Sequence, residues 1–76
     1  MYGYSNFYFS ISMSKEQLLA VYSGSIRRVR VRTESGMVLD IDAEHLKNFT
    51  TMDGIHGRFK LTVDSRNRFV SLNKIG

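Results

Sequence analysis

Residues 25–41 constrain the fold of this chain most strongly, because apolar and charged side chains alternate along two short segments. A period of two is typical of half-buried β-strands. A two-residue loop between the segments would mix apolar and charged side chains on each face. A three-residue loop, Glu34-Ser35-Gly36, instead pairs Val31 with Leu39 and collects the alternating apolar side chains on one face. Gly36 then occupies the position where such a loop needs a left-handed residue, so the sequence predicts this three-residue hairpin.

The same register makes two further predictions about the hairpin. It places Arg30 opposite Asp40, where a cross-strand ion pair contributes about 0.2–1 kcal/mol. Ile26 breaks the alternation because it shares parity with the arginines. We therefore expect a β-bulge at Arg27-Arg28 that returns Ile26 to the apolar face.

Local signals place the other elements along the chain. Alternation predicts a first strand over residues 7–13. Ser14 and Gln17 fit a capping box that begins a helix, and Gly24 sits where a glycine would end it. Asp42 is the expected N-cap of a short helix or turn over residues 42–49. Residues 50–57 are expected to be irregular, and strands are expected over residues 58–63 and 69–72, with an extension of the last strand to residue 75 as the alternative.

The order strand, helix, hairpin, short helix, hairpin predicts a single α+β domain over residues 1–76. The expected architecture is an antiparallel sheet of about five strands (β-α-β-β-short α-β-β) with one helix packed on it. A small closed barrel of the Sm or SH3 kind is the alternative. In the last hairpin, pairing Leu61 with Leu72 and Val63 with Val70 leaves Phe69 on the outer face with residues 60 and 62, although the opposite register also remains open.

Composition excludes several classes of protein. The 76 residues contain no cysteine, so disulfides and thiolate chemistry are absent. No apolar run approaches the roughly 20 residues of a membrane span. The first residues lack the basic and apolar regions of a signal peptide, so we expect a cytoplasmic protein that does not contact a membrane. There is no nucleophile elbow and no phosphate-binding glycine loop, which predicts a non-enzymatic protein without a cofactor.

The two histidines lie in the only segments that resemble small-molecule sites. Asp40, Asp42 and His45 have the ligand types of a metal site, but each has a simpler structural explanation and we expect no metal there. The segment Asp53-Gly54-Ile55-His56-Gly57 is the candidate functional loop, and Asp53 with His56 would suit acid–base chemistry. We nevertheless favour a structural role for it, in which both glycines form a tight connection and His56 hydrogen-bonds backbone.

Basic residues supply the leading functional hypothesis. The chain has a net charge of +4 and an isoelectric point near 9.8, a balance typical of proteins that meet polyanions. Arginine beside exposed aromatic rings is the usual surface of single-stranded nucleic-acid binders. The candidate interface for RNA or single-stranded DNA comprises Arg28, Arg30, Arg32, Arg58, Lys60, Arg68 and Phe69.

Three alternatives compete with this hypothesis. The arginines can form an ordinary solvated strand face. A protein-interaction module with an acidic partner is the second. The third and weaker alternative is cyclic-dinucleotide sensing, because Arg28-x-x-x-Arg32 is similar to the first half of the PilZ signature. The second half of that signature is absent.

Several of these motifs occur together in one family. The chain resembles a family of short, mostly gammaproteobacterial proteins filed as a domain of unknown function. The resemblance rests on Tyr22-Ser23-Gly24-Ser25, Val29-Arg30-Val31-Arg32, Ala43 with Leu46 and Phe49, the run from Phe49 to Phe59, and Phe69-Val70-Ser71-Leu72. Asp-Gly-Ile-His-Gly-Arg-Phe, residues 53–59, is its most specific part. The resemblance covers nearly the whole chain and implies no activity, substrate or partner.

Overall fold

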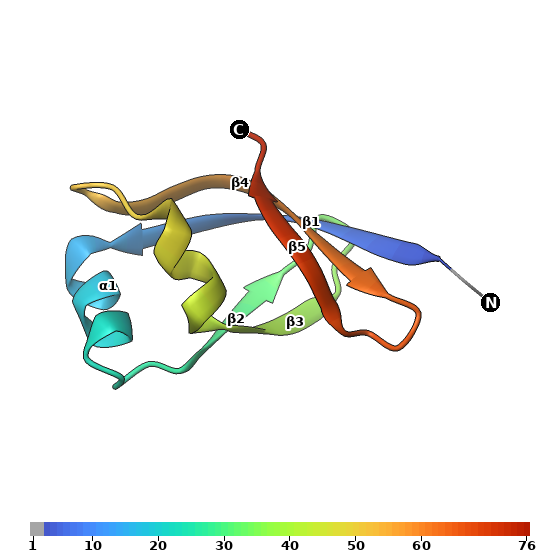
Figure 1. The fold of residues 1–76 in the computed structure, drawn as a ribbon. Helices are drawn as coiled ribbons and strands as arrows, with labels where there is room; N and C mark the ends of the chain where they lie inside the picture. Colours follow the sequence, from blue (N-terminus) through green and yellow to red (C-terminus); the bar gives the residue numbers. More distant parts are fainter. Residues whose placement is uncertain (1–2) are drawn as a thin grey trace.

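The computed structural model describes residues 3–76. In chain order it contains β1 (Tyr4–Ser14), α1 (Lys15–Tyr22), β2 (Arg28–Arg32), β3 (Val38–Asp42), the 3₁₀ helix η1 (Ala43–Phe49), β4 (Gly54–Asp64) and β5 (Phe69–Lys74). The long strands β1 and β4 run side by side, and the β2–β3 hairpin lies across them with α1 at one end (Figure 1). The protein is therefore a small α+β structure, as the sequence predicts.

The strands form two antiparallel sheets, in the orders β1-β4-β5 and β2-β3. The single five-stranded sheet that the sequence predicts is therefore wrong, and the five strands do not close into the alternative barrel either. The reason lies between β1 and β2. The Glu34 N–H donates to the Tyr8 carbonyl over 2.8 Å, but neither sheet pairs β1 with β2 as neighbouring strands. The sheets instead meet through their apolar faces.

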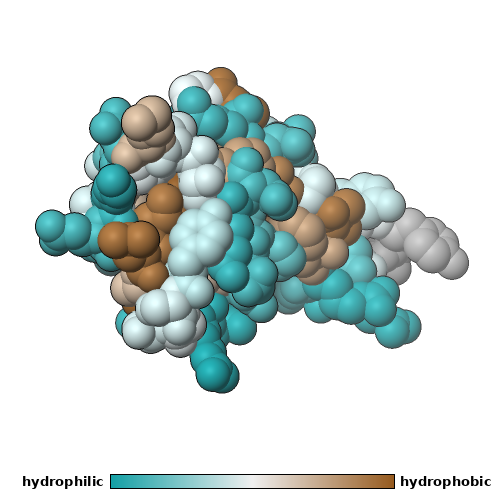
Figure 2. All heavy atoms as spheres, turned by 60° about the vertical axis from the view of Figure 1, so that its left-hand side comes forward, coloured by the Kyte–Doolittle hydropathy of each residue, from teal (hydrophilic) through white to brown (hydrophobic). Residues whose placement is uncertain are grey.

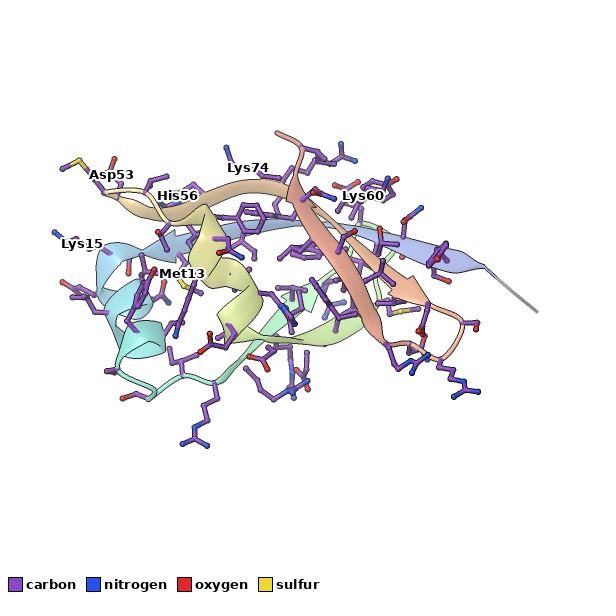
Figure 3. All side chains as sticks on the ribbon, viewed as in Figure 1. Met13, Lys15, Asp53, His56, Lys60 and Lys74 are labelled. Carbon is purple, nitrogen blue, oxygen red and sulfur yellow. The ribbon has the colours of Figure 1, made fainter. Side chains whose placement is uncertain are left out.

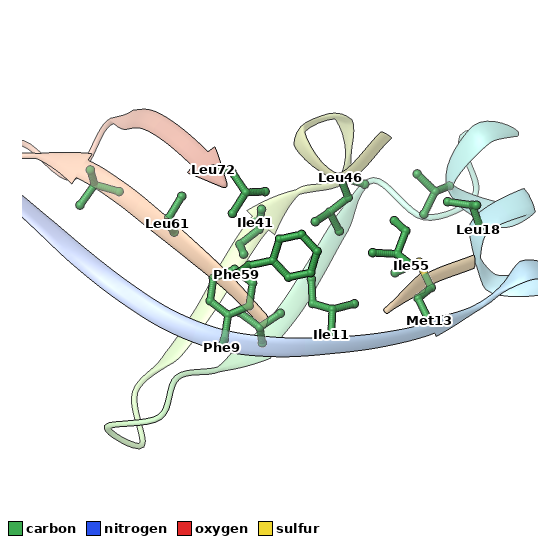
Figure 4. Close-up of a cluster of buried hydrophobic side chains, with 14 residues drawn as sticks. Phe9, Ile11, Met13, Leu18, Ile41, Leu46, Ile55, Phe59, Leu61 and Leu72 are labelled. Carbon is green, nitrogen blue, oxygen red and sulfur yellow. The ribbon is translucent and has the colours of Figure 1, made fainter. Parts of the chain in front are cut away.

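One apolar core joins the two sheets and both helices (Figure 4). Phe9, Leu46, Ile55 and Phe59 are its largest fully buried side chains. The alternation of burial along β1 and β4 follows from the period of two in their sequences, because successive side chains of a strand point to opposite faces.

The β2–β3 hairpin has the predicted register and loop. Val31 pairs with Leu39 and Arg30 with Asp40, and Gly36 has a φ of +92°. The predicted bulge at residues 27–28 is wrong: the β2–β3 pairing is regular, and Ile26 packs against the core from the segment ahead of β2. Met37 lies beyond the end of the ladder and stays 49% exposed.

Both predicted helix caps are present. Ser14 and Gln17 form the capping box of α1, and the Asp42 side chain accepts from the Glu44 N–H at the start of η1. Leu18 and Val21 of α1 are buried, whereas Tyr22 is 52% exposed. Figure 2, in which the α1 end is turned forward, has small separate apolar patches on a mostly hydrophilic surface. Neither helix described within residues 3–76 has the length and hydrophobicity needed to cross a membrane.

The irregular segment predicted over residues 50–57 is largely wrong. Gly54 begins β4, which continues through His56 and Gly57 and pairs with β1 along its whole length. A turn joins η1 to β4, with Thr51 and Gly54 bridged through their backbones. Strand pairing therefore extends β4 four residues further toward the N-terminus than the predicted strand, which starts at Arg58.

The β4–β5 hairpin also corrects the predicted position of Phe69. Leu61 pairs with Leu72 as predicted, but a bulge at Thr62/Val63 shifts the register so that Val63 faces Phe69 rather than Val70. Residues opposite one another in a ladder share a face. Phe69 therefore lies on the core-side face of the sheet, at its edge, and not on the outer face with Lys60.

Candidate nucleic-acid interface

Three arginines at and before β2 carry charge that no carboxylate neutralises. Four ion pairs occur in the part of the chain that the structure describes, and none of them includes these three arginines. Arg30, which lies between them in the sequence, is paired with Asp40 at 3.3 Å. Arg28 donates from Nη2 to the Asp40 backbone carbonyl at 3.4 Å, a contact that orients its guanidinium without cancelling the charge. Arg27 and Arg32 are likewise exposed and outside the ion pairs. This segment is therefore the main unneutralised cationic surface beside the β2–β3 hairpin.

An aromatic stack lies near the start of this segment. The His45 and Phe69 rings are parallel within 5°, with their centroids 3.7 Å apart. Phe69 remains 44% exposed, so much of its surface is open to a further partner. The sequence gives no local signal for this stack, because it depends on the β4–β5 bulge and on the position of η1.

The turn before β5 fixes the position of Phe69. Asp64 Oδ1 accepts from the backbone N–H groups of Arg66 and Arg68 at 2.8 and 2.9 Å, and its Oδ2 accepts from Arg68 Nε at 2.9 Å. The hydrogen bond from the Arg68 N–H has the largest effect among several contacts that lower the pKa of Asp64, so this carboxylate stays ionised at neutral pH. Asn67 adopts a left-handed φ of 61°, which asparagine tolerates better than most residues.

Arg28 and the stacked rings line one open hollow of about 210 Å³. Its other lining residues are Asp40, Ile41, Asp42, Leu61, Val63 and Asn67. A larger hollow of about 530 Å³ lies between the end of α1 and η1, and Arg27 and Arg28 line it as well. Arg28 thus stands at the border of both hollows, with an aromatic surface on one side and a second arginine on the other.

The remaining members of the predicted interface do not join this hollow. Lys60 alternates with the buried Phe59 and Leu61 and therefore points to the outer face of the three-stranded sheet. Figure 3 shows Lys60 and Lys74 above β4, with the β2–β3 hairpin on the other side. Arg68 is paired with Asp64. The predicted interface is thus divided between two sides of the molecule.

Arg58 is held in contacts of its own on that outer face. Its Nε and Nη2 donate to the two Glu34 carboxylate oxygens at 2.6 and 2.8 Å, and its guanidinium lies 5.4 Å from the Tyr8 ring centroid. Through these hydrogen bonds Arg58 lowers the pKa of Glu34, and Glu34 raises the pKa of Arg58. A bidentate pair of this kind fixes the geometry of both side chains, so Arg58 ties the β2–β3 loop to β4.

Residues 54–57 form the start of β4, and His56 contacts the backbone of Asp53 rather than its carboxylate. His56 Nε2 lies 3.1 Å from the Asp53 backbone oxygen, and His56 Nδ1 lies 3.1 Å from Ser12 Oγ. His56 therefore contacts the backbone of the turn, which is the structural role that the sequence analysis favours. The Asp53 carboxylate takes no part in these contacts.

The three metal-type residues near β3 have separate structural roles. Within residues 3–76 no group of three or more histidine, cysteine, aspartate or glutamate side chains has the arrangement of a metal site. Asp40 pairs with Arg30 and Asp42 caps η1, as expected from the sequence. His45 stacks on Phe69.

Comparison with known proteins identifies a family and no closer relative. No curated protein and no solved structure matches the chain significantly. A family described as "Protein of unknown function (DUF2835)" matches residues 5–75, which is nearly the whole chain. This match confirms the resemblance to a family of proteins of unknown function over nearly the whole chain. The chain therefore belongs to this family of proteins of unknown function.

Proposed function

We propose that the protein is a non-enzymatic module that binds RNA or single-stranded DNA at the hollow formed by Arg28, His45 and Phe69. The single observation that carries the proposal is the presence of an unneutralised arginine and a half-exposed stacked aromatic ring in one hollow. Single-stranded nucleic acid needs both groups, because its phosphates seek cations and its unpaired bases stack on aromatic faces.

Phosphate contact is assigned to the arginines beside this hollow. Arg28 is oriented by a backbone carbonyl and keeps its charge, and Arg27 lies next to it along the border of the larger hollow. Arg32 lies four residues further on the same strand face, about 13 Å away at the usual rise per residue. A backbone running along β2 would meet Arg28 and Arg32 in turn, whereas Arg30 is already paired with Asp40.

Base contact is assigned to the Phe69 end of the hollow. A base stacked on a phenylalanine contributes about 1–3 kcal/mol to binding. Asp40, Asp42 and Asn67 line the hollow and supply oxygen acceptors that suit the amino groups of a base, and the two carboxylates repel phosphate. This separation of arginines from carboxylates suits a single-stranded nucleic acid whose phosphates lie along the arginines while one base enters the hollow. An acidic protein partner would find these carboxylates unfavourable.

The salt dependence of binding tests the proposal. Each phosphate contact to a single strand contributes about −0.7 to the slope of log affinity against log salt concentration. Changing Arg28 and Arg32 together to Gln should therefore flatten the slope by about 1.4 and weaken binding, while the fold stays intact. The measurement is fluorescence anisotropy of a labelled single-stranded RNA at several salt concentrations, with circular dichroism to check folding.

Arg30→Gln is the matched control, because it removes an arginine of the same strand face whose charge Asp40 already balances. We expect Arg30→Gln to change the slope less than Arg28→Gln does. Equal effects of the two variants, a slope unaffected by the double change, or the absence of binding at low salt would each contradict the proposal.

A further inference from the structure

The edges of the two sheets form an open seam beside β1. The loop that follows β2 meets β1 at one backbone hydrogen bond, from the Glu34 N–H to the Tyr8 carbonyl at 2.8 Å. Beyond this contact β1 and β2 separate around an opening of about 360 Å³. The opening is lined by residues 10–13 of β1, Gln17 of α1, and residues 29–32 of β2. Neither strand has a second strand neighbour on this side.

Strand geometry identifies which backbone groups of β1 face the seam. The Arg58 N–H donates to the Gly76 carbonyl and the Arg58 carbonyl accepts from Ile75, so the backbone groups of Arg58 point toward the β5 side. Backbone groups alternate in direction along a strand. Odd-numbered residues of β4 therefore face β1, and their odd-numbered partners in β1 face β4. The N–H and C=O groups of Ser10 and Ser12 consequently point into the seam.

The same argument applies to β2. The Thr33 N–H donates to the Met37 carbonyl at 2.7 Å, so the backbone groups of Thr33 face β3. By alternation the backbone groups of Arg30 and Arg32 face away from β3, toward the seam. The Glu34 N–H lies on this side too, which agrees with its bond to β1. Two rows of hydrogen-bonding groups without a strand partner thus line one opening.

We propose that an extended segment of an acidic partner protein adds to β1 in this seam. An added strand would pair with the free backbone groups of Ser10 and Ser12, as in other cases of recognition by strand addition. Its inward side chains would contact Ile11 and Val31, which line the opening. Its outward side chains would lie beside Arg32, so a segment that alternates apolar and acidic residues matches the surface.

Charge distinguishes this occupant from a second copy of the chain. The protein carries a net charge of +4, and residues 27–32 include four arginines. Two copies joined at this edge would bring these positive charges together, which opposes association. The seam and the hollow at Phe69 share no lining residue; Arg32, which is assigned above to phosphate contact, lines the seam, whereas Ser10 belongs to the seam alone. Loss of nucleic-acid binding and loss of strand addition can therefore be told apart.

The test uses a blocked hexapeptide of alternating valine and aspartate, with a valine–lysine peptide as its charge control. We expect the valine–aspartate peptide to bind, and to slow hydrogen exchange of the Ser10 and Ser12 amides. Ser10→Pro removes only an N–H that faces the seam, so the β1–β4 bonds stay, and it should weaken binding at least about tenfold. Ser10→Ala keeps the N–H and should bind like the unchanged protein.

A second measurement does not depend on folding of the proline variant. A valine–aspartate peptide with N-methyl groups on its pairing edges keeps its charge but cannot add as a strand, so it should fail to bind the unchanged protein. The proposal is overturned if neither unmodified peptide binds or if the lysine peptide binds equally well. It is also overturned if the N-methylated peptide binds unimpaired, or if a folded Ser10→Pro variant keeps full affinity. Slow exchange of the Ser10 and Ser12 amides in the free protein would show a closed seam and would overturn it too.

Discussion

Replacing Phe59 with Ala should lower the free energy of unfolding by about 3–5 kcal/mol, the usual cost of deleting a buried phenylalanine ring. Phe59 is 0% exposed and packs between Phe9, with ring centroids 6.1 Å apart, and Phe49, at 5.2 Å. A domain of this size has a total stability of roughly 4–11 kcal/mol. The variant should therefore lose about a quarter or more of its stability, measured by urea denaturation followed by circular dichroism.

Phe69→Ala is the matched control for that prediction. It removes the same atoms from a ring that is 44% exposed and stacks only on His45, so we expect a loss below about 1.5 kcal/mol. Equal losses at the two positions would mean that Phe59 does not occupy the centre of the core.

Replacing Gly54 with Ala should destabilise the protein by about 3 kcal/mol or more. A Cβ at Gly54 would clash with the Met13 carbonyl oxygen and would lie 2.9 Å from the Ser14 carbonyl carbon, and both neighbours are backbone atoms. The Gly54 φ of +116° adds strain for any L side chain. Relief would require β4 to move away from β1, where the two strands pair. Thermal unfolding monitored by circular dichroism measures the loss.

Gly36→Ala separates the two causes of that loss. Gly36 also has a positive φ, of +92°, but a Cβ there would meet nothing within 4 Å. This variant therefore reports conformational strain alone, at about 1–2 kcal/mol. If Gly54→Ala costs no more than Gly36→Ala, the start of β4 does not approach β1 as closely as described.

Features fixed by neighbouring residues were predictable from the sequence. The β2–β3 register follows from side-chain parity, because a one-residue shift would put Val31 of β2 and Ile41 of β3 on opposite faces of the hairpin. Gly36 supplies the left-handed loop residue, and Ser14 with Gln17 caps α1 through contacts only three residues apart. In each case the interaction that decides the structure lies within the segment itself.

Features that depend on distant contacts were not predictable in this way. The sequence around Gly54 and Gly57 predicts a turn. Both glycines instead lie in β4, where backbone atoms of other segments approach too closely to leave room for a side chain. The division into two sheets depends on where β1 and β2 separate. The candidate site depends on the same kind of contact, since the β4–β5 bulge and the position of η1 together bring Phe69 onto His45. Arg28 was anticipated as a site residue from its strand face, whereas His45 was not.

The most direct test of nucleic-acid binding is a map of the contact surface by nuclear magnetic resonance. A short single-stranded RNA is added to the labelled protein, and amide and aromatic shifts are followed. The account predicts the largest changes at Arg28, His45 and Phe69, with upfield movement of the Phe69 ring protons as a base stacks on them. Residues on the opposite face, such as Lys60, should not move. Changes centred on Lys60, or none at saturating RNA, would contradict the account.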